Sequence, residues 1–259
     1  MHVGGRLERS RKAESILTAT IVCPGYYELH ELLRSSVDRS LGSAIEVTSV
    51  ITKVDPDWAS FDTDLVLSTI EPGASGDRFV RIQPFLTDAD VDRIQQAAAR
   101  VRRARRLTRL RAELARYFVA DAFVYPLPDE GEEAIIRRLG GLLVDAGLIG
   151  DDYVDNTILR ERMSSTAFTD ALAVPHALQM TATRTAIAIG VADGSAAWGE
   201  GRVQVVALAA FSESDRAAFQ TVFEQLVEVF SERDTVQRIL RRGTTFEAFL
   251  DELVAVIDG

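Results

Sequence analysis

The residue of this sequence best suited to chemistry is His176, the only histidine in the last two-thirds of the chain. It follows Pro175, whose ring fixes the backbone angle φ and which has no N–H to donate. A neutral imidazole is a good nucleophile near neutral pH, and moving a phosphoryl group onto it requires mainly positioning and positive charge. The stretch from Leu159 to Ala177 therefore indicates an imidazole that is presented as a phosphoryl acceptor.

The residues before His176 include other groups that such a site needs. Arg160 or Arg162, at the end of a predicted helix, could bind phosphate oxygens in a bidentate manner. A hydroxyl cluster could donate hydrogen bonds to the phosphate or fix the tautomer of the ring; it comprises Ser164, Ser165 and Thr166. No Ser-His-Asp order or metal-ligand spacing accompanies His176, so a purely structural histidine is the alternative.

Cys23, the only cysteine, is the second candidate. It lies where an apolar, β-branched segment ends and a predicted helix begins, and the free N–H groups of a helix N-terminus bind phosphate. A phosphorylated thiol is one hypothesis, and an inert, half-buried thiol is the other. A tyrosine-phosphatase site is excluded, because it needs an arginine six residues after the cysteine and Leu29 stands there.

Composition limits the class of protein. The chain has 259 residues, 47% of them hydrophobic, which allows two ordinary domains with sizeable cores. Its net charge of -10 argues against a general binder of nucleic acids or anionic membranes, and no apolar run is long enough to cross a bilayer. One cysteine and the scattered His2, His30 and His176 indicate neither a disulfide nor a metal site. We expect a soluble cytoplasmic protein without metal or cofactor, and we place His30 on an exposed helix face.

The first part of the chain predicts a small α/β domain after a polar tail. Strands are expected at 15–22, 44–51, 64–69 and 79–82, and a helix at 29–41. This order of elements favours a mostly parallel sheet.

From residue 87 to about 123 the pattern becomes helical and rich in arginine. Leu107, Leu110, Leu114 and Phe118 lie on one apolar stripe, with arginines on the other faces. We interpret this segment as a solvated connecting helix, since it lacks the interleaved aromatic residues of a single-strand nucleic-acid binder.

A second α/β domain is expected after the prolines at 126 and 128. Helices are predicted at 130–146, 151–162, 212–230, 234–241 and 245–257, and strands at 185–192 and 202–210.

Four motifs of this second part form one pattern. They are EEAIIRRLGGLLVDAGLI (132–149), YVDNTILRERMSSTAF (153–168), ALAVPHA (171–177) and AAWGEGRVQVVALAAFS (196–212). With them, residues 129–257 resemble the mannitol/fructose-type enzyme IIA domain (EIIA type-2) of the bacterial phosphoenolpyruvate-dependent sugar phosphotransferase system. The resemblance implies that His176 accepts a phosphoryl group from phospho-HPr and that Arg160 lines the active site.

One departure concerns a second active-site histidine, which transport-type members of that family carry after the second strand. Here the region reads SESDRAAFQ and contains Arg216 but no histidine. Either Arg216 replaces the missing positive charge or transfer is slow. The loss favours a regulatory domain over a high-flux carrier.

The first part is similar to a galactitol/lactose-type enzyme IIB domain, through VCPGYYELHELL (22–33) and DLVLSTI (64–70). In that family the cysteine at the strand end becomes phosphocysteine, a role that the resemblance gives to Cys23. The loop departs from the family, because Tyr26, Tyr27 and Glu28 replace small residues and Glu28 would repel an incoming anion.

The order of the parts, together with PFLTDADVDRIQ (84–95), resembles the C-terminal half of BglG/MtlR/LicR-type transcriptional regulators and antiterminators. The expected fold is α/β with two domains, a small parallel-sheet IIB-like domain and a mixed-sheet IIA-like sandwich joined by an arginine-rich helix. The expected boundaries are 1–14 for the polar tail, 15–86 for the IIB-like domain, 87–128 for the helical linker and 129–259 for the EIIA type-2 domain.

Three hypotheses of function follow from this organisation. The first is a phosphorylation-sensing regulatory module, standing alone or cut from a longer regulator, whose phosphorylation on His176 controls a transcriptional regulator or antiterminator. The second is a transport-type enzyme IIA/IIB that relays phosphate to a sugar, and the third is a structural interaction domain without phosphotransfer. Expected partners are phospho-HPr and either enzyme IIB/IIC components or regulatory PRD domains, without direct nucleic-acid contact by this segment or membrane insertion; a homodimer is left open.

Overall fold

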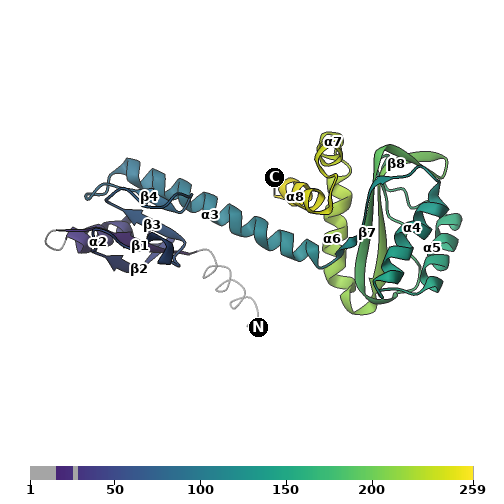
Figure 1. Ribbon diagram of the computed structural model, residues 1–259, viewed down its shortest axis with the longest axis horizontal. Coiled ribbons are helices and arrows are strands. Elements are labelled where there is room, and N and C mark those ends of the chain that lie inside the picture. Colours follow the sequence, from purple (N-terminus) through teal and green to yellow (C-terminus); the bar gives the residue numbers. More distant parts are fainter. Residues whose placement is uncertain (1–15, 26–28, 259) are drawn as a thin grey trace, which may run out of the picture. The chain divides into compact units, whose positions relative to one another are not determined.

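The computed structural model describes residues 16–25 and 29–258 and divides the chain into two compact units, Met1–Arg106 and Leu107–Gly259 (Figure 1). Each unit has its own sheet and its own core. None of the helices within the described residues is long and apolar enough to span a bilayer.

The first unit is built on a four-stranded parallel sheet with the order β2-β1-β3-β4. Its elements are β1 (Leu17–Val22), α2 (Leu29–Leu41), β2 (Ile45–Ile51), a short 3₁₀ turn at Trp58–Ser60, β3 (Leu65–Ser68) and β4 (Phe79–Arg81). The central strands β1 and β3 are almost wholly buried, as the near-continuous apolar runs of buried parallel strands require. The predicted parallel α/β sheet of this region is confirmed.

The long helix α3 (Asp88–Ala115) begins in the first unit, where Ile94, Ala97 and Ala98 pack on the core of the sheet. Its start is fixed by Asp90, which is fully buried. The carboxylate of Asp90 accepts hydrogen bonds from the N–H and hydroxyl of Thr87 and from the N–H of Gln83. A buried charge is tolerated here because it is satisfied by several donors.

Replacing Asp90 by asparagine is expected to destabilise the first unit by about 1–3 kcal/mol, because an amide cannot accept all of these hydrogen bonds. Burial alone raises the pKa of the Asp90 carboxyl, but the bonds from Thr87 and Gln83 and the charge of Arg93 hold the pKa below its ordinary value. The carboxylate therefore contributes stability above the unfolded-state pKa of about 3.9, and the contribution is lost as pH falls through the lower folded-state pKa.

Hydrogen–deuterium exchange of first-unit peptides, measured against urea at neutral and acidic pH, checks this prediction. Asp88→Asn is the matched control, because Asp88 is an exposed aspartate in the same first turn. Equal stability of both variants at neutral pH would contradict the assigned role of Asp90.

The second unit contains a mixed sheet with the order β5-β7-β8-β6. The long strands β7 (Thr181–Trp198) and β8 (Gly201–Ser212) are antiparallel, whereas β5 (Phe118–Leu127) is parallel to β7 and β6 (Leu172–Ala173) is parallel to β8. The two central strands are buried over most of their length on both faces. The predicted mixed-sheet sandwich is confirmed.

Helices cover both faces of this sheet (Figure 1). One core lies under α4 (Glu132–Asp145) and α5 (Asp151–Met163) and takes in Ala186, Ala188 and Leu208 of the central strands. The other takes in their neighbours in sequence, such as Ile187 and Ala209, and packs against α6 (Arg216–Val229), α7 (Arg233–Arg242) and α8 (Phe246–Ile257). Alternate side chains of each strand therefore enter opposite cores, as strand geometry requires.

The predicted extent of the arginine-rich helix is wrong at its end. The helix stops at Ala115, and the next residues form β5 from Phe118. The amides of Arg116 and Tyr117 close the last turn on Glu113 and Leu114. The strand then buries Phe118 and Leu127 and pairs with β7, and its proline is tolerated because β5 is an edge strand.

Candidate functional site

His176 lies in the segment between β6 and β7. Like β6 before it, this segment runs parallel to β8. Its backbone forms a parallel bridge with Ala209, and the Ala209 N–H donates to the carbonyl of Pro175 at 2.9 Å. Since Pro175 has no N–H of its own, only its carbonyl is available for this pairing. The Pro-His pair is therefore held against an interior strand.

The imidazole of His176 is held in one orientation by its own segment. Its Nδ1 lies 2.9 Å from the carbonyl oxygen of Val174, and its ring meets the ring of Phe211 edge-on, with centroids 5.7 Å apart. A carbonyl oxygen can only accept, so Nδ1 must carry the proton in this contact. The neutral ring then has its lone pair on Nε2, which is the nucleophilic nitrogen.

A buried tyrosine joins the backbone of this segment to β8. The hydroxyl of Tyr153 donates to the carbonyl of Ala209 at 3.2 Å and accepts from the N–H of Phe211 at 3.0 Å. The N–H of Ala177 also bonds this hydroxyl. Burial raises the pKa of Tyr153, while the two amide bonds act against this rise. Tyr153 of α5 therefore links Ala177, the residue after His176, to Phe211, against which the imidazole packs.

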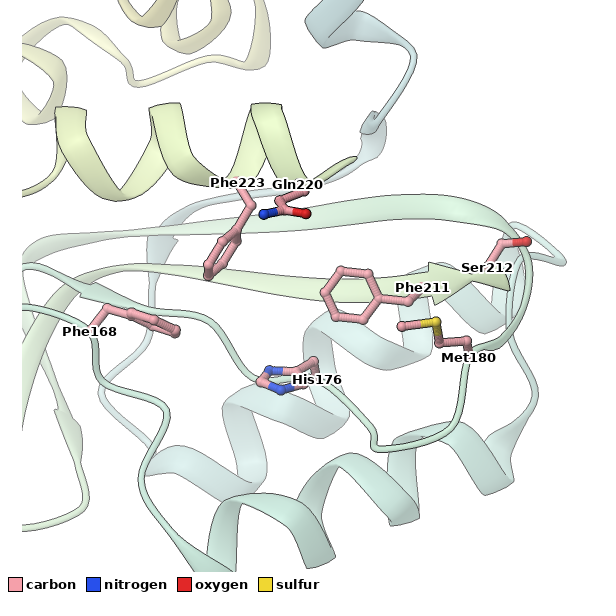
Figure 2. A pocket seen from close by; sticks show the side chains of 7 residues that line it. All are labelled: Phe168, His176, Met180, Phe211, Ser212, Gln220 and Phe223. Carbon is pink, nitrogen blue, oxygen red and sulfur yellow. The ribbon is translucent and has the colours of Figure 1, made fainter. Parts of the chain in front are cut away.

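A pocket of 290 Å³ opens beside the imidazole (Figure 2). Its lining is mainly apolar, with three phenylalanines and a methionine around the histidine: Phe168, His176, Met180, Phe211, Ser212, Gln220 and Phe223. His176 itself is half-buried. His176 is therefore not a fully buried core residue.

The hydroxyl cluster predicted near the phosphate has a different role in its buried member, Thr166. Both the N–H and the hydroxyl of Thr166 donate to the carboxylate of Glu161, which also accepts from the indole N–H of Trp198 at 2.9 Å. Glu161 and Trp198 are both buried. Thr166 thus anchors the loop after α5, and the tautomer of His176 is fixed by Val174 and not by a hydroxyl group.

The two candidate arginines differ in their partners. Arg162 forms an ion pair with Glu133, a carboxylate that it shares with Arg137. Arg160 donates to the carbonyl of Ser164 at 2.7 Å and forms no ion pair with any residue that the structure describes. Arg160 therefore keeps a positive charge without a carboxylate partner, although it is not part of the lining of the His176 pocket.

Comparison with known families gives a match over residues 124–254 to the phosphoenolpyruvate-dependent sugar phosphotransferase system, EIIA 2. The chain belongs to this family. The match covers half of the chain, including His176 and the elements around it, and confirms the resemblance that the sequence motifs carried.

Whole-chain similarity is to bacterial regulators. The transcriptional regulator ManR of Bacillus subtilis is 26% identical over 98% of this chain and 39% of that protein. The probable licABCH operon regulator of the same organism is 21% identical over 93% of this chain and 36% of that protein. The chain thus spans well under half the length of these relatives. The crystal structure of IIA mannitol from Escherichia coli has a TM-score of 0.46, with 20% identity over 52% of this chain and 97% of that one.

In transport-type members the second histidine lies in the region that corresponds to residues 212–220. In this chain, that region contributes polar but uncharged side chains to the pocket of His176. Ser212 and Gln220 line the pocket of His176, and Asp215 accepts a hydrogen bond from the N–H of Thr185. The side chain of Arg216 lies outside the described residues, so its predicted replacement of the second imidazole stays a prediction.

Cys23 lies at the end of β1 and is 1% exposed. Its N–H donates to the carbonyl of Ile51 at 2.9 Å, so this amide is not free to bind phosphate. The helix α2 is described from Leu29 onward, so the predicted position of Cys23 beside a helix N-terminus stays a prediction. Tyr26, Tyr27 and Glu28 lie outside the described residues. The resemblance of residues 15–86 to an enzyme IIB domain stays a prediction.

The prediction that His30 lies on an exposed helix face is wrong. Its side chain is 28% exposed, and its Nδ1 is buried without a hydrogen-bond partner among the described residues. The neighbouring Leu29 and Leu33 pack on the core of the first unit, so this turn of α2 lies against that core. His30 belongs to the first unit.

Three parts of the site were missed by sequence reasoning. Tyr153, the carbonyl of Val174 and the apolar lining of the pocket leave no signal in residue type or spacing. Tyr153 and Phe211 are 58 residues apart in the chain, and only the packing of α5 against β8 brings them together.

Proposed function

We propose that the chain is a phosphorylation-sensing regulatory module of the phosphotransferase system and that His176 is its phosphoryl acceptor. The observation that carries this proposal is the contact of Nδ1 with the carbonyl of Val174, which leaves Nε2 as the nucleophile. The half-buried position of the ring, at the edge of a pocket, leaves room for a donor to approach.

The proposed step is a transfer of one phosphoryl group from phospho-HPr. The lone pair of Nε2 attacks phosphorus, the bond from phosphorus to the donor breaks, and its electron pair leaves with the donor. Nδ1 keeps its proton and its bond to Val174 throughout. No metal or cofactor enters this scheme.

Arg160 is the residue proposed to stabilise the transferred group. Its charge has no carboxylate partner within the described residues, whereas Arg162 is paired with Glu133. A guanidinium can bind two phosphate oxygens at once. Reaching them requires Arg160 to leave the carbonyl of Ser164, a neutral partner that costs little to exchange for an anion.

A regulatory role is favoured over a sugar-phosphorylating relay by three observations. The similarity over nearly the whole chain is to transcriptional regulators, the pocket of His176 lacks a second imidazole among the described residues, and Cys23 is buried. Phosphorylation would add about -1.5 to -2 charges beside an apolar pocket and so change what docks there. The proposed partners are phospho-HPr and the regulatory PRD domains of a transcriptional regulator, with enzyme IIB/IIC components as the alternative, in the cytoplasm; a homodimer is a further proposal.

The proposal is tested by incubating the intact chain with labelled phosphoenolpyruvate, enzyme I and HPr. We expect one phosphate per chain, and none when HPr is left out. Label that appears without HPr would contradict HPr as donor, and no label with the full set would contradict the proposed function.

Replacing Cys23 by serine is expected to leave this labelling unchanged. The thiol is 1% exposed and its amide already bonds Ile51, so it offers no route for phosphate. Liquid scintillation counting of the two proteins under the same conditions checks the result. A large loss of label in the serine variant would revive the relay hypothesis.

A further inference from the structure

A second cavity of the EIIA unit shares no lining residue with the pocket of His176, although Phe168 of one lining and Thr169 of the other are neighbours in the chain. Its volume is 520 Å³, which falls in the range of about 300–1,000 Å³ typical of small-molecule sites. Three parts of the chain form it: the segment before β6, the ends of β7 and β8 at their connecting turn, and the junction of α6 and α7.

The walls of this cavity are held together by hydrogen bonds across the three parts. The hydroxyl of Thr169 donates to the carbonyl of Phe230 at the end of α6 and accepts from the N–H of Ala171. The N–H of Gln204 on β8 donates to the carbonyl of Ala171 at 3.0 Å. The cavity is therefore preformed, which lowers the cost of ordering on binding.

Four polar side chains of the cavity lining are available to a ligand. Asp170, Gln204, Arg233 and Gln237 form no side-chain hydrogen bond or ion pair within residues 16–25 and 29–258. Gln204 is half-buried, so its amide is already partly withdrawn from water. Together they offer one carboxylate, one guanidinium and two amides to a single space.

The charges around the cavity balance. Asp170 and Arg233 carry opposite charges, and the guanidinium of Arg202 is neutralised by Asp129 and also bonds Ser195. A phosphorylated ligand would meet the carboxylate of Asp170, and an apolar one would give no hydrogen bond to the half-buried Gln204. A neutral molecule with many hydroxyl groups, each both donor and acceptor, satisfies carboxylate, guanidinium and amide alike.

We propose that this cavity binds a neutral polyhydroxylated molecule of the size of a hexose or hexitol, contacted by Asp170, Gln204, Arg233 and Gln237. The proposal does not depend on phosphorylation of His176. It gives the EIIA unit a ligand site separate from its phosphoryl acceptor.

Saturation-transfer difference NMR on the intact chain tests the proposal with D-glucose, D-sorbitol and glucose 6-phosphate as probes. We expect a signal for at least one neutral probe, with a dissociation constant of about 1 mM, and a weaker one for the phosphate ester. No signal from either neutral probe, or tighter binding of the ester, would overturn the assignment.

Gln204→Ala and Arg233→Ala are each expected to weaken binding of the neutral probe about tenfold, because each removes a hydrogen-bonding group from the cavity. Gln95→Ala is the matched control, since Gln95 is an exposed glutamine of α3 in the first unit. Arg233 is exposed, Gln204 is half-buried, and neither side chain bonds another described residue, so we expect both variants to keep the fold, which a circular dichroism spectrum checks. Binding that is unchanged in both variants would refute the site.

Discussion

Replacement of His176 by alanine is expected to reduce phosphate incorporation from phosphoenolpyruvate, enzyme I and HPr to background. Nε2 is the ring nitrogen of His176 that is left with a lone pair at this pocket, because Nδ1 is occupied by the carbonyl of Val174. Without the accepting nitrogen the transfer cannot occur, so we expect labelling to be abolished and not merely slowed. Autoradiography of the labelled chain measures the effect.

Two further variants separate chemistry from folding. His176→Asn places an amide N–H near the position of Nδ1, so it can keep the bond to Val174 while it removes Nε2; we expect no label and a normal fold. His30→Ala removes another histidine from the first unit and should keep the label, because His30 is outside the EIIA unit. Label retained by either His176 variant would show that another residue is the acceptor.

Replacement of Tyr153 by phenylalanine is expected to destabilise the EIIA unit by about 1–3 kcal/mol, the cost of leaving buried backbone groups unsatisfied. The phenol uses its full capacity of one donor and two acceptor sites, on Ala209, Phe211 and Ala177. Phenylalanine keeps the ring in the core but leaves these three groups without their shared partner. Urea unfolding of the two proteins measures the difference.

The same substitution is expected to slow phosphorylation of His176 between about tenfold and a hundredfold, because small displacements of a reacting group are costly. Ala177 and Phe211 flank the imidazole, so release of both amides loosens the ring. Tyr125→Phe is the matched control, since Tyr125 is an exposed tyrosine of β5. A rate like that of the unaltered chain, measured well below the unfolding transition, would assign Tyr153 a purely structural role.

Local patterns of the sequence were sufficient for most of the elements. The leucines at helical spacing give α2, the β-branched run before Cys23 gives β1, and the apolar runs at 185–192 and 202–210 give the central part of β7 and β8. Such patterns record which side chains must leave water, and they act over one or two turns or a single strand. The motif around Pro175 and His176 likewise identifies the EIIA family by residue type and spacing alone.

The errors occurred where partners distant in the chain decide the outcome. Residues 118–123 look helical beside an arginine-rich helix, yet they become a strand because the edge of β7 is available for pairing. The burial of Cys23 and the bond from its amide to β2 also depend on a distant partner, whereas the sequence left a phosphorylated and an inert thiol as alternatives. Neither result follows from the residues on either side.

The sequence by itself determined the family of the EIIA unit, the α/β class and the identity of the candidate acceptor, His176, because these depend on residue types and short spacings. The tertiary structure alone decided which imidazole nitrogen keeps its lone pair, that Tyr153 bonds the backbone of β8 beside His176 and that Arg162 is already paired. These properties arise from hydrogen bonds and ion pairs whose geometry exists only after α4, α5 and β8 have packed together.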